Sequence, residues 1–371
     1  MEVSARCCYT TKLPMSAETV VEATGSYSRR IRNRLLVLLA LLILLAAIGL
    51  FSLRIGSYPL SISQIIQGIV ATPDDQLINH LLWNIRLPRT VAAMLAGAAL
   101  ALSGSIMQTL LKNPLAAPST LGVSQGAAFG AACAIILLGS GQTFSTGNEA
   151  VLLSSRSITA TCAFFGAVFS IAVILTIASV RQLSSEALVL SGVAMAAFFS
   201  ACTMLLQYFA SDLQVAATLF WTFGDLGKAG WQENGLMALL LLLTGGFVLY
   251  RGWCFNSLQW GDEVARTLGV HTSRLRLIGL LLTCLLTAVI TAYLGIIAFI
   301  GLMAPHLIRP LIGNDQRFLL PAAALCGALL LLVADILSRV ILAPVVIPVG
   351  IITSFAGAPL FLFLLLQRRQ L

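Results

Sequence analysis

The sequence predicts an all-α integral membrane protein with about ten transmembrane helices. Of its 371 residues, 58% are hydrophobic and only 10% are charged, whereas soluble domains carry roughly 25% charged residues. The mean hydropathy is +0.96. Because a spanning helix needs about 20 mostly apolar residues, ten spans joined by short loops occupy nearly the whole chain. This composition excludes a soluble globular fold and leaves no room for a separate catalytic or nucleotide-binding domain.

Apolar runs without charged residues mark the ten predicted spans. We expect residues 35–371 to form a single transmembrane domain, preceded by a poorly ordered cytoplasmic extension of residues 1–34. The run that starts at residue 35 is too long for the core of a cleaved signal peptide, so we expect it to remain in the mature protein. The predicted spans are residues 35–53, 90–111, 119–140, 157–179, 187–210, 235–250, 277–294, 296–312, 318–338 and 348–366.

The distribution of basic residues predicts the orientation of the chain. The sequence has 22 Lys and Arg residues against 14 Asp and Glu, a net charge of +8. With a cytoplasmic N-terminus, most basic residues fall in cytoplasmic segments, as the positive-inside rule requires. An even number of spans then places both termini in the cytoplasm of a multi-pass protein of the inner membrane, and no nucleic-acid partner is needed to explain the charge. The outer segments keep Arg54, Arg86, Arg89, Arg156, Lys228 and Arg339.

The sequence carries no signature of a bound cofactor, a metal site or a catalytic centre. Its eight cysteines are scattered without a C-x-x-C pair, so they suggest neither a disulfide framework nor a zinc site. The motifs H-E-x-x-H and G-x-S-x-G are absent, and residues 224–229 (GDLGKA) lack the spacing of a phosphate-binding loop. If the protein depends on ATP, another chain must bind it.

Arg86 and Arg89 precede the second span, in the motif RLPR. Their outer position runs against the positive-inside trend, and two explanations remain open. Long basic side chains at this depth snorkel to the interface, or their guanidinium groups dock an acidic partner by binding carboxylates bidentately. Arg339 is a third outer arginine, and Asp335 lies one helical turn before it. We therefore expect these two side chains to meet on one helix face, as a structural or a functional pair.

The longest polar loop on the predicted cytoplasmic side covers residues 260–276. Asp262 and Glu263 suit the first turn of a short helix, where the helix dipole favours negative charge. Gly269 suits the end of that helix. A short amphipathic helix of this kind lies on the bilayer surface or forms a contact for a cytoplasmic partner, and the pattern alone leaves both interpretations open.

Two regions contain residues that interrupt helices. Pro118 is followed by Gly126 and Gly130, and the last third of the chain holds Pro305 and Pro310. Non-helical backbone at membrane depth is tolerated where it lines a watery cavity, so these regions indicate a pathway, although Gly and Pro are also frequent in ordinary membrane helices. We expect the lone His306 to be a structural hydrogen-bonding residue, because no acid or second histidine at helical spacing completes a proton relay.

Taken together, these motifs resemble the FecCD family, the permeases of ATP-binding-cassette (ABC) importers for ferric siderophores, haem and cobalamin. The resemblance covers nearly the whole chain from about residue 35. Its most specific parts are RLPRTVAAMLAGAALALSGSIMQTLLKNPLAAPSTLGVSQGA (residues 86–127), GDEVARTLGV (261–270), GIIAFIGLMAPHLIRPLIGNDQR (295–317) and ADILSR (334–339).

The resemblance implies a type II importer: a homodimer of ten-span subunits around a central pathway, with two cytoplasmic ATPase subunits and a periplasmic or lipid-anchored binding protein. ATP and Mg²⁺ would be used by the ATPase, and this chain would bind no cofactor. By the same resemblance, Arg86, Arg89 and Arg339 meet glutamates of the binding protein, and Ser184 and Ser185 lie near the cytoplasmic gate, where Glu186 departs from the pattern. The residues of the implied coupling loop to the ATPase are Gly261, Asp262, Glu263, Ala265, Arg266, Leu268 and Gly269.

The cargo is expected to be a ferric siderophore, with cobalamin or haem as the alternative. The segment of residues 220–228 (FWTFGDLGK) offers aromatic rings and a cation on the outer side, which suit a chelate or an interfacial aromatic belt. The competing class is a secondary transporter driven by an ion gradient, which predicts several membrane-embedded acids. Only Asp335 is clearly embedded in the predicted spans, so the sequence favours the ATP-driven class.

Overall fold

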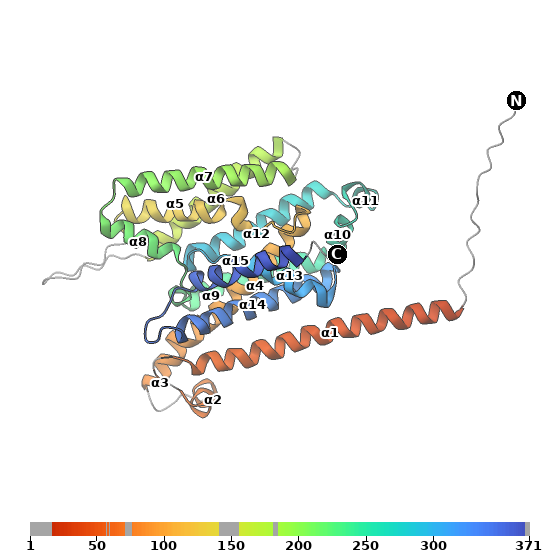
Figure 1. The fold of residues 1–371 in the computed structure, drawn as a ribbon, viewed down its shortest axis with the longest axis horizontal. Helices are drawn as coiled ribbons and strands as arrows, with labels where there is room; N and C mark the ends of the chain where they lie inside the picture. Colours follow the sequence, from red (N-terminus) through yellow and green to blue (C-terminus); the bar gives the residue numbers. More distant parts are fainter. Residues whose placement is uncertain are drawn as a thin grey trace.

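A computed structural model describes residues 17–56, 58, 60–70, 76–140, 156–180 and 185–367. Within these ranges the secondary structure is entirely helical, with no strand. The helices form one elongated bundle, and most of the long helices run along its length (Figure 1). This arrangement confirms the predicted all-α membrane fold.

Ten apolar helices of the described chain coincide with the ten predicted spans. Seven of them are long and apolar enough to cross a membrane, and α5, α13 and α15 are shorter apolar helices. The ten are α1 (Ala17–Arg54), α4 (Leu87–Leu110), α5 (Val123–Ile136), α6 (Arg156–Val180), α7 (Ser185–Tyr208), α9 (Trp231–Tyr250), α12 (Thr272–Leu294), α13 (Ile300–Ile312), α14 (Gln316–Val340) and α15 (Val349–Gln367).

Shorter helices lie at the two ends of the bundle. We call the end that carries α10 (Gly252–Leu258) and α11 (Asp262–Thr267) the coupling end. The opposite end carries α2 (Ile62–Val70), α3 (Gln76–His80) and α8 (Asp212–Thr222) (Figure 1). The sequence did not reveal α8, although Ser211 and Gln214 form the capping box that begins it.

The first helix begins earlier than the predicted span. Helix α1 starts at Ala17 rather than near residue 35, so the described part of the N-terminal extension continues the span as helix. Residues added to an existing helix avoid the cost of nucleation, and no proline interrupts Ala17–Arg54. Residues 1–16, with Cys7 and Cys8, lie outside the described residues. Figure 1 shows α1 running past the bundle at the coupling end.

Glycines allow α4 to pack directly against the backbone of α13 and α14. A Cβ atom on Gly104 would lie 1.9 Å from the carbonyl oxygen of Gly301, and one on Gly97 would lie 2.3 Å from that of Gly327. No side chain fits at such separations. Membrane helices gain little from hydrophobic burial against one another, so close backbone packing of small residues is a main source of their association.

The glycines of α5 likewise serve helix packing. Gly126 and Gly130 lie inside α5, where a Cβ atom on Gly130 would lie 2.1 Å from the carbonyl oxygen of Cys162 in α6. Pro305 and Pro310 also lie inside a helix, α13. The break in the last third of the chain comes earlier, between α12 and α13, where Gly295 and Phe299 adopt positive φ angles of 82° and 65°.

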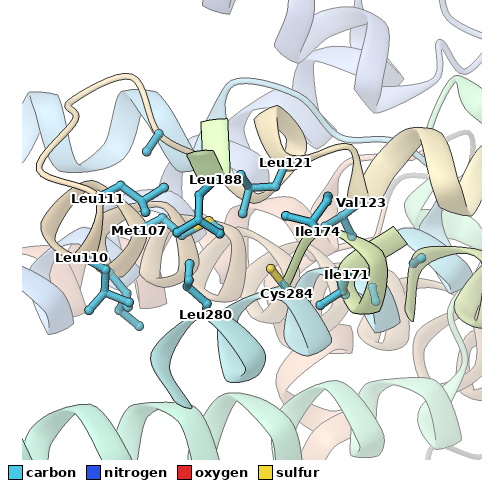
Figure 2. Close-up of a cluster of buried hydrophobic side chains, with 14 of the residues drawn as sticks. Met107, Leu110, Leu111, Leu121, Val123, Ile171, Ile174, Leu188, Leu280 and Cys284 are labelled. Atoms are coloured by element: carbon cyan, nitrogen blue, oxygen red, sulfur yellow. The ribbon is translucent and has the colours of Figure 1, made fainter. Parts of the chain in front are cut away.

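Aliphatic side chains from α4, α6, α7 and α12 fill the space between these helices. Figure 2 shows Met107, Leu110, Ile174, Leu188 and Leu280 converging in one cluster, and all five are buried. This cluster joins α4 to the helices on both sides of it, so α4 is the central helix of the bundle.

Candidate functional site

Helix α4 connects two groups of charged side chains, one at each end of the bundle. Its 24 residues span about 36 Å at 1.5 Å per residue, slightly more than the roughly 30 Å hydrocarbon core of a bilayer. Arg86 and Arg89 lie at its start, and Lys112 follows its end. These two groups are the candidate sites.

Asp335 is the centre of the first group, which we call the outer arginine cluster (Arg86, Arg89, Asp335 and Arg339). The carboxylate of Asp335 is fully buried. Its Oδ1 accepts a hydrogen bond of 2.7 Å from Nε of Arg89, and its Oδ2 lies 2.7 Å from Nη2 of Arg339. The predicted Asp335–Arg339 pair is therefore confirmed, and the sequence did not reveal that Arg89 shares the same carboxylate.

The arginines of this cluster also hold the end of α1. Nη1 of Arg339 donates to the carbonyl oxygens of Ser52 and Ile55 at 3.1 and 2.8 Å. Arg86 is only 6% exposed; it donates to the carbonyl oxygen of Leu53 at 2.7 Å and to that of Tyr58. Three arginines around one aspartate leave the cluster with net positive charge.

A wide helical turn sets the position of Arg86. Residues Leu81–Arg86 form a π-helix that runs directly into α4. Such turns are rare in proteins, and those that occur are often found at functional sites. The side chains of the outer arginine cluster therefore link α1, α4 and α14 by hydrogen bonds and ion pairs, and we call this linkage the clasp. Docking of a binding protein by Arg86, Arg89 and Arg339 stays a prediction. Arg54, which follows Leu53 at the end of α1, is exposed.

At the coupling end, α11 forms where the sequence predicts a short helix. Asp262 and Glu263 occupy its first turn, and Gly269 follows it with a φ of 80°, the left-handed conformation that favours glycine. Ala265 faces the protein core, whereas Val264 and Leu268 are 44% and 66% exposed. The helix thus presents apolar side chains outward at the end of the bundle.

Two cations tie this helix to the end of α4. Oδ1 of Asp262 lies 2.7 Å from Nζ of Lys112, and its Oδ2 lies 3.1 Å from Nη2 of Arg276. Nε of Arg276 donates to the carbonyl oxygen of Leu110 at 3.1 Å. Partial burial would raise the pKa of Asp262, but the hydrogen bond from Lys112 and the charge of Arg276 outweigh it and lower that pKa below its usual value.

Asp315 forms a second junction at the coupling end that the sequence did not reveal. Its carboxylate accepts hydrogen bonds from Arg317 and from Asn256 of α10, and it pairs with Arg34 of α1 at 3.2 Å. Partial burial favours a raised pKa for Asp315, but the hydrogen bonds from Arg317 and Asn256 lower it below the usual value. A pattern search misses this site because its members come from three separate segments: the start of α14, α10 and α1.

The remaining predicted residues have different outcomes. Ser185 begins α7, while Ser184 lies outside the described residues. In the predicted aromatic segment Phe220 is exposed, but Trp221 is 8% exposed and packs in the core. The segment therefore offers less exposed aromatic surface than expected.

Nδ1 of His306 lies 2.8 Å from the carbonyl oxygen of Leu302, a local contact that suits a structural histidine.

The fold and its two end sites define a multi-pass membrane protein of the transport-permease class. Residues 38–367 match the FecCD transport family, and the chain belongs to that family. It is an ABC importer permease subunit rather than an enzyme. Membership implies ATPase subunits and a substrate-binding protein as partners, and metal chelates, haem or cobalamin as the class of cargo.

Several relatives are similar over most of their length. A protein of Methanocaldococcus jannaschii named as an ABC transporter permease is 47% identical, covering 92% of this chain and 97% of the relative. The hemin permease HmuU of Yersinia pestis is 39% identical (89% and 95%), and the Fe(3+)-citrate permease YfmE of Bacillus subtilis is 37% identical (91% and 97%). The vitamin B12 permease BtuC of Citrobacter koseri is 39% identical (78% and 83%).

A solved structure of an ABC transporter of the metal-chelate type, in an inward-facing conformation, has the same fold. It superimposes with a TM-score of 0.75 at 31% sequence identity, covering 90% of this chain and 99% of that chain. The similarity therefore extends over almost the whole bundle.

Proposed function

We propose that this chain is the permease subunit of an ABC importer that moves a ferric siderophore into the cytoplasm by alternating access. The observation that carries the proposal is the ion pair between Asp262 of α11 and Lys112 at the end of α4. An ATPase shifts the permease between states only through contacts that differ between them. The pair gives a direct connection from the exposed helix α11 to the central helix of the bundle.

In this proposal the ATPase subunits bind the outward face of α11. Val264, Leu268 and the neighbouring Trp260 are exposed there, and apolar and aromatic side chains are the usual anchors of a protein interface. Arg266 and Glu263 are also exposed and supply a polar rim. The cytoplasmic orientation of both termini is supported by the arrangement of the bundle, since α1 begins and α15 ends at the coupling end (Figure 1).

The ATPase contact is tested by Leu268→Glu, which places a charge in the proposed interface. We expect co-purification of the ATPase with the tagged permease to fall strongly, because an unpaired charge at the centre of an interface is costly. Leu213→Glu is the matched control, since Leu213 is also exposed but lies in α8 at the opposite end. Equal ATPase recovery with both variants would contradict this contact.

A second copy of the chain is proposed to complete the pathway. Helix α7 carries a row of exposed apolar side chains, among them Leu190, Met204 and Tyr208, and Phe355 of α15 is 84% exposed. Such faces are covered by lipid or by another subunit. Cross-linking through Met204→Cys measures the contact, and a chain that stays monomeric in the assembled importer would contradict the homodimer.

The binding protein is proposed to dock at the outer arginine cluster. The cluster has net positive charge, and exposed Arg54 extends it, so the field there attracts an acidic partner and raises its association rate. Arg54→Glu is the cleanest test, because Arg86, Arg89 and Arg339 also hold the fold together. We expect slower association and a weaker salt dependence, and unchanged association would contradict docking at this end.

The choice of cargo is supported by the relatives named for hemin and Fe(3+)-citrate and by the transporter of the metal-chelate type. Vitamin B12 permeases are equally similar, so cobalamin and haem are the second candidates. Uptake of radiolabelled ferric siderophore, haem and cobalamin by cells with and without this gene separates them. Loss of ferric siderophore uptake supports the proposal, and loss of only haem or only cobalamin uptake would refute it.

A further inference from the structure

A cavity of about 320 Å³ lies beside the segment that follows α11, where α9 ends and α12 begins. Its volume falls within the roughly 300–1,000 Å³ of small-molecule sites. Arg251, His271 and Arg274 line it together with the apolar side chains of Phe247 and Ile278. A second hollow of about 450 Å³ shares His271 and Arg274 and adds Arg266. Neither set of lining residues contains a carboxylate.

The basic residues of this cavity have no acidic partner among the residues that the structure describes. Arg251 and Arg274 make none of the ion pairs found there, and neither does His271. Of the two acids of the loop, Asp262 is engaged by Lys112 and Arg276, and Glu263 lines neither hollow. The cavity therefore keeps uncompensated positive charge, and the start of α12, which has no side-chain cap, adds the positive end of a helix dipole.

An apolar surface continues from the cavity toward the middle of the bundle. Ile278 and Leu281 of α12 are exposed, one turn apart. Leu242 and Leu249 of α9, a helix that contacts α12, are exposed as well. Tyr250, which precedes the cavity residue Arg251, is 81% exposed, and the guanidinium of Arg251 lies 5.3 Å from the centre of its ring. Tyrosine and arginine at the end of a membrane helix mark the depth of the lipid headgroups.

We propose that this cavity binds the phosphate headgroup of an anionic phospholipid, with the acyl chains lying along the exposed faces of α9 and α12. The charge alone suits any phosphate, but only a lipid also covers the apolar surface that begins at Ile278. Basic pockets between membrane helices are favoured sites for anionic headgroups. The assignment of the site to the inner leaflet rests on the proposed orientation of the chain. Lipid binding itself does not depend on that orientation.

The site also bears on the coupling helix. Gly269 and Val270, which end the α11 segment, line the same cavity. A headgroup held by Arg251 and Arg274 would sit against this backbone and restrict its movement. The lipid would then act as a support for the segment that receives the ATPase.

The test measures lipid binding by the purified full-length chain, using native mass spectrometry. The probes are phosphatidylglycerol and phosphatidylcholine with identical acyl chains. We expect the unaltered protein to prefer phosphatidylglycerol, and the double variant Arg251→Gln with Arg274→Gln to lose about tenfold in that preference. Arg251→Lys with Arg274→Lys keeps the charge and should keep the preference. Arg29→Gln with Arg30→Gln, at exposed arginines of α1, removes the same charge elsewhere and should leave it unchanged.

Three outcomes would overturn the proposal. One is an unchanged preference in the Arg251→Gln, Arg274→Gln variant whose thermal unfolding matches the unaltered protein. Another is displacement of the bound phosphatidylglycerol by excess inorganic phosphate, which would indicate a soluble anion as the occupant. The third is complete loss of the lipid on assembly with the ATPase, which would assign the cavity to the protein interface. None of these readouts depends on transport, so the lipid site and the transport proposal fail separately.

Discussion

Nε of Arg89 and Oδ1 of Asp335 lie 2.7 Å apart although the two residues are 246 positions apart in the sequence. Their contact joins the start of α4 to the last turns of α14, and Arg339 shares the same carboxylate. Asp335 is fully buried, so this one negative charge compensates two arginines in a region of low dielectric. The clasp therefore depends on a single carboxylate.

Asp335→Asn should destabilise the protein strongly. The substitution keeps the shape of the side chain but leaves Arg89 and Arg339 without a negative partner, and removal of one member of a buried pair costs about 3–5 kcal/mol. Thermal unfolding of the purified permease measures the effect. Asp212→Asn is the control, because Asp212 is an exposed acid in α8, and an equal midpoint for both variants would show that the clasp contributes nothing.

Gly104→Ala should disrupt the packing of α4 against α13. The added methyl group would lie 1.9 Å from the carbonyl oxygen of Gly301, so the two backbones must separate, and overpacking of this kind costs about 1–3 kcal/mol or more. The unfolding midpoint should fall. Gly245→Ala in α9, where a Cβ atom meets nothing within 4 Å, should not lower it, and a fall of the same size at both positions would argue against backbone contact as the cause.

Gly269→Val should uncouple ATP hydrolysis from transport. Gly269 has a φ of 80°, and a β-branched residue in this conformation is strained by about 1–2 kcal/mol, so the end of α11 should change shape. Gly269→Asn is the matched control, because asparagine tolerates left-handed backbone. The measurement is substrate transported per ATP hydrolysed in proteoliposomes. An equal loss of transport per ATP in the Gly269→Val and Gly269→Asn variants would show that any side chain at this position, rather than backbone strain, causes the effect.

The two junctions at the coupling end should make stability fall in acid. The pKa values of Asp262 and Asp315 are lowered in the folded protein, relative to about 3.9 in the unfolded chain. The unfolded chain therefore binds protons first as the pH falls, so the stabilisation is complete above about pH 4 and is lost below it. The unfolding midpoint of the permease, followed from neutral to acid pH, should decline less steeply in Asp315→Asn. An identical decline in this variant would refute the assignment.

The sequence by itself determined which segments form the apolar helices of the bundle and where the short helix α11 begins and ends. Both follow from local chemistry, because an apolar run of sufficient length must be helical in a bilayer and the acidic first turn and terminal Gly269 specify a helix within a few residues. The Asp335–Arg339 pair was predictable for the same reason, since one helical turn separates the two residues.

Only the tertiary structure decided which distant residues meet. Arg89 with Asp335, Asp262 with Lys112, and Arg34 with Asp315 each join segments that are far apart in the sequence, and no local periodicity encodes such contacts. The packing role of Gly126 also came from the tertiary structure, because a glycine that permits a close helix contact and one that breaks a helix look alike in sequence. Helix formation is a local property of the chain, whereas the pairing of charges depends on which helices pack together.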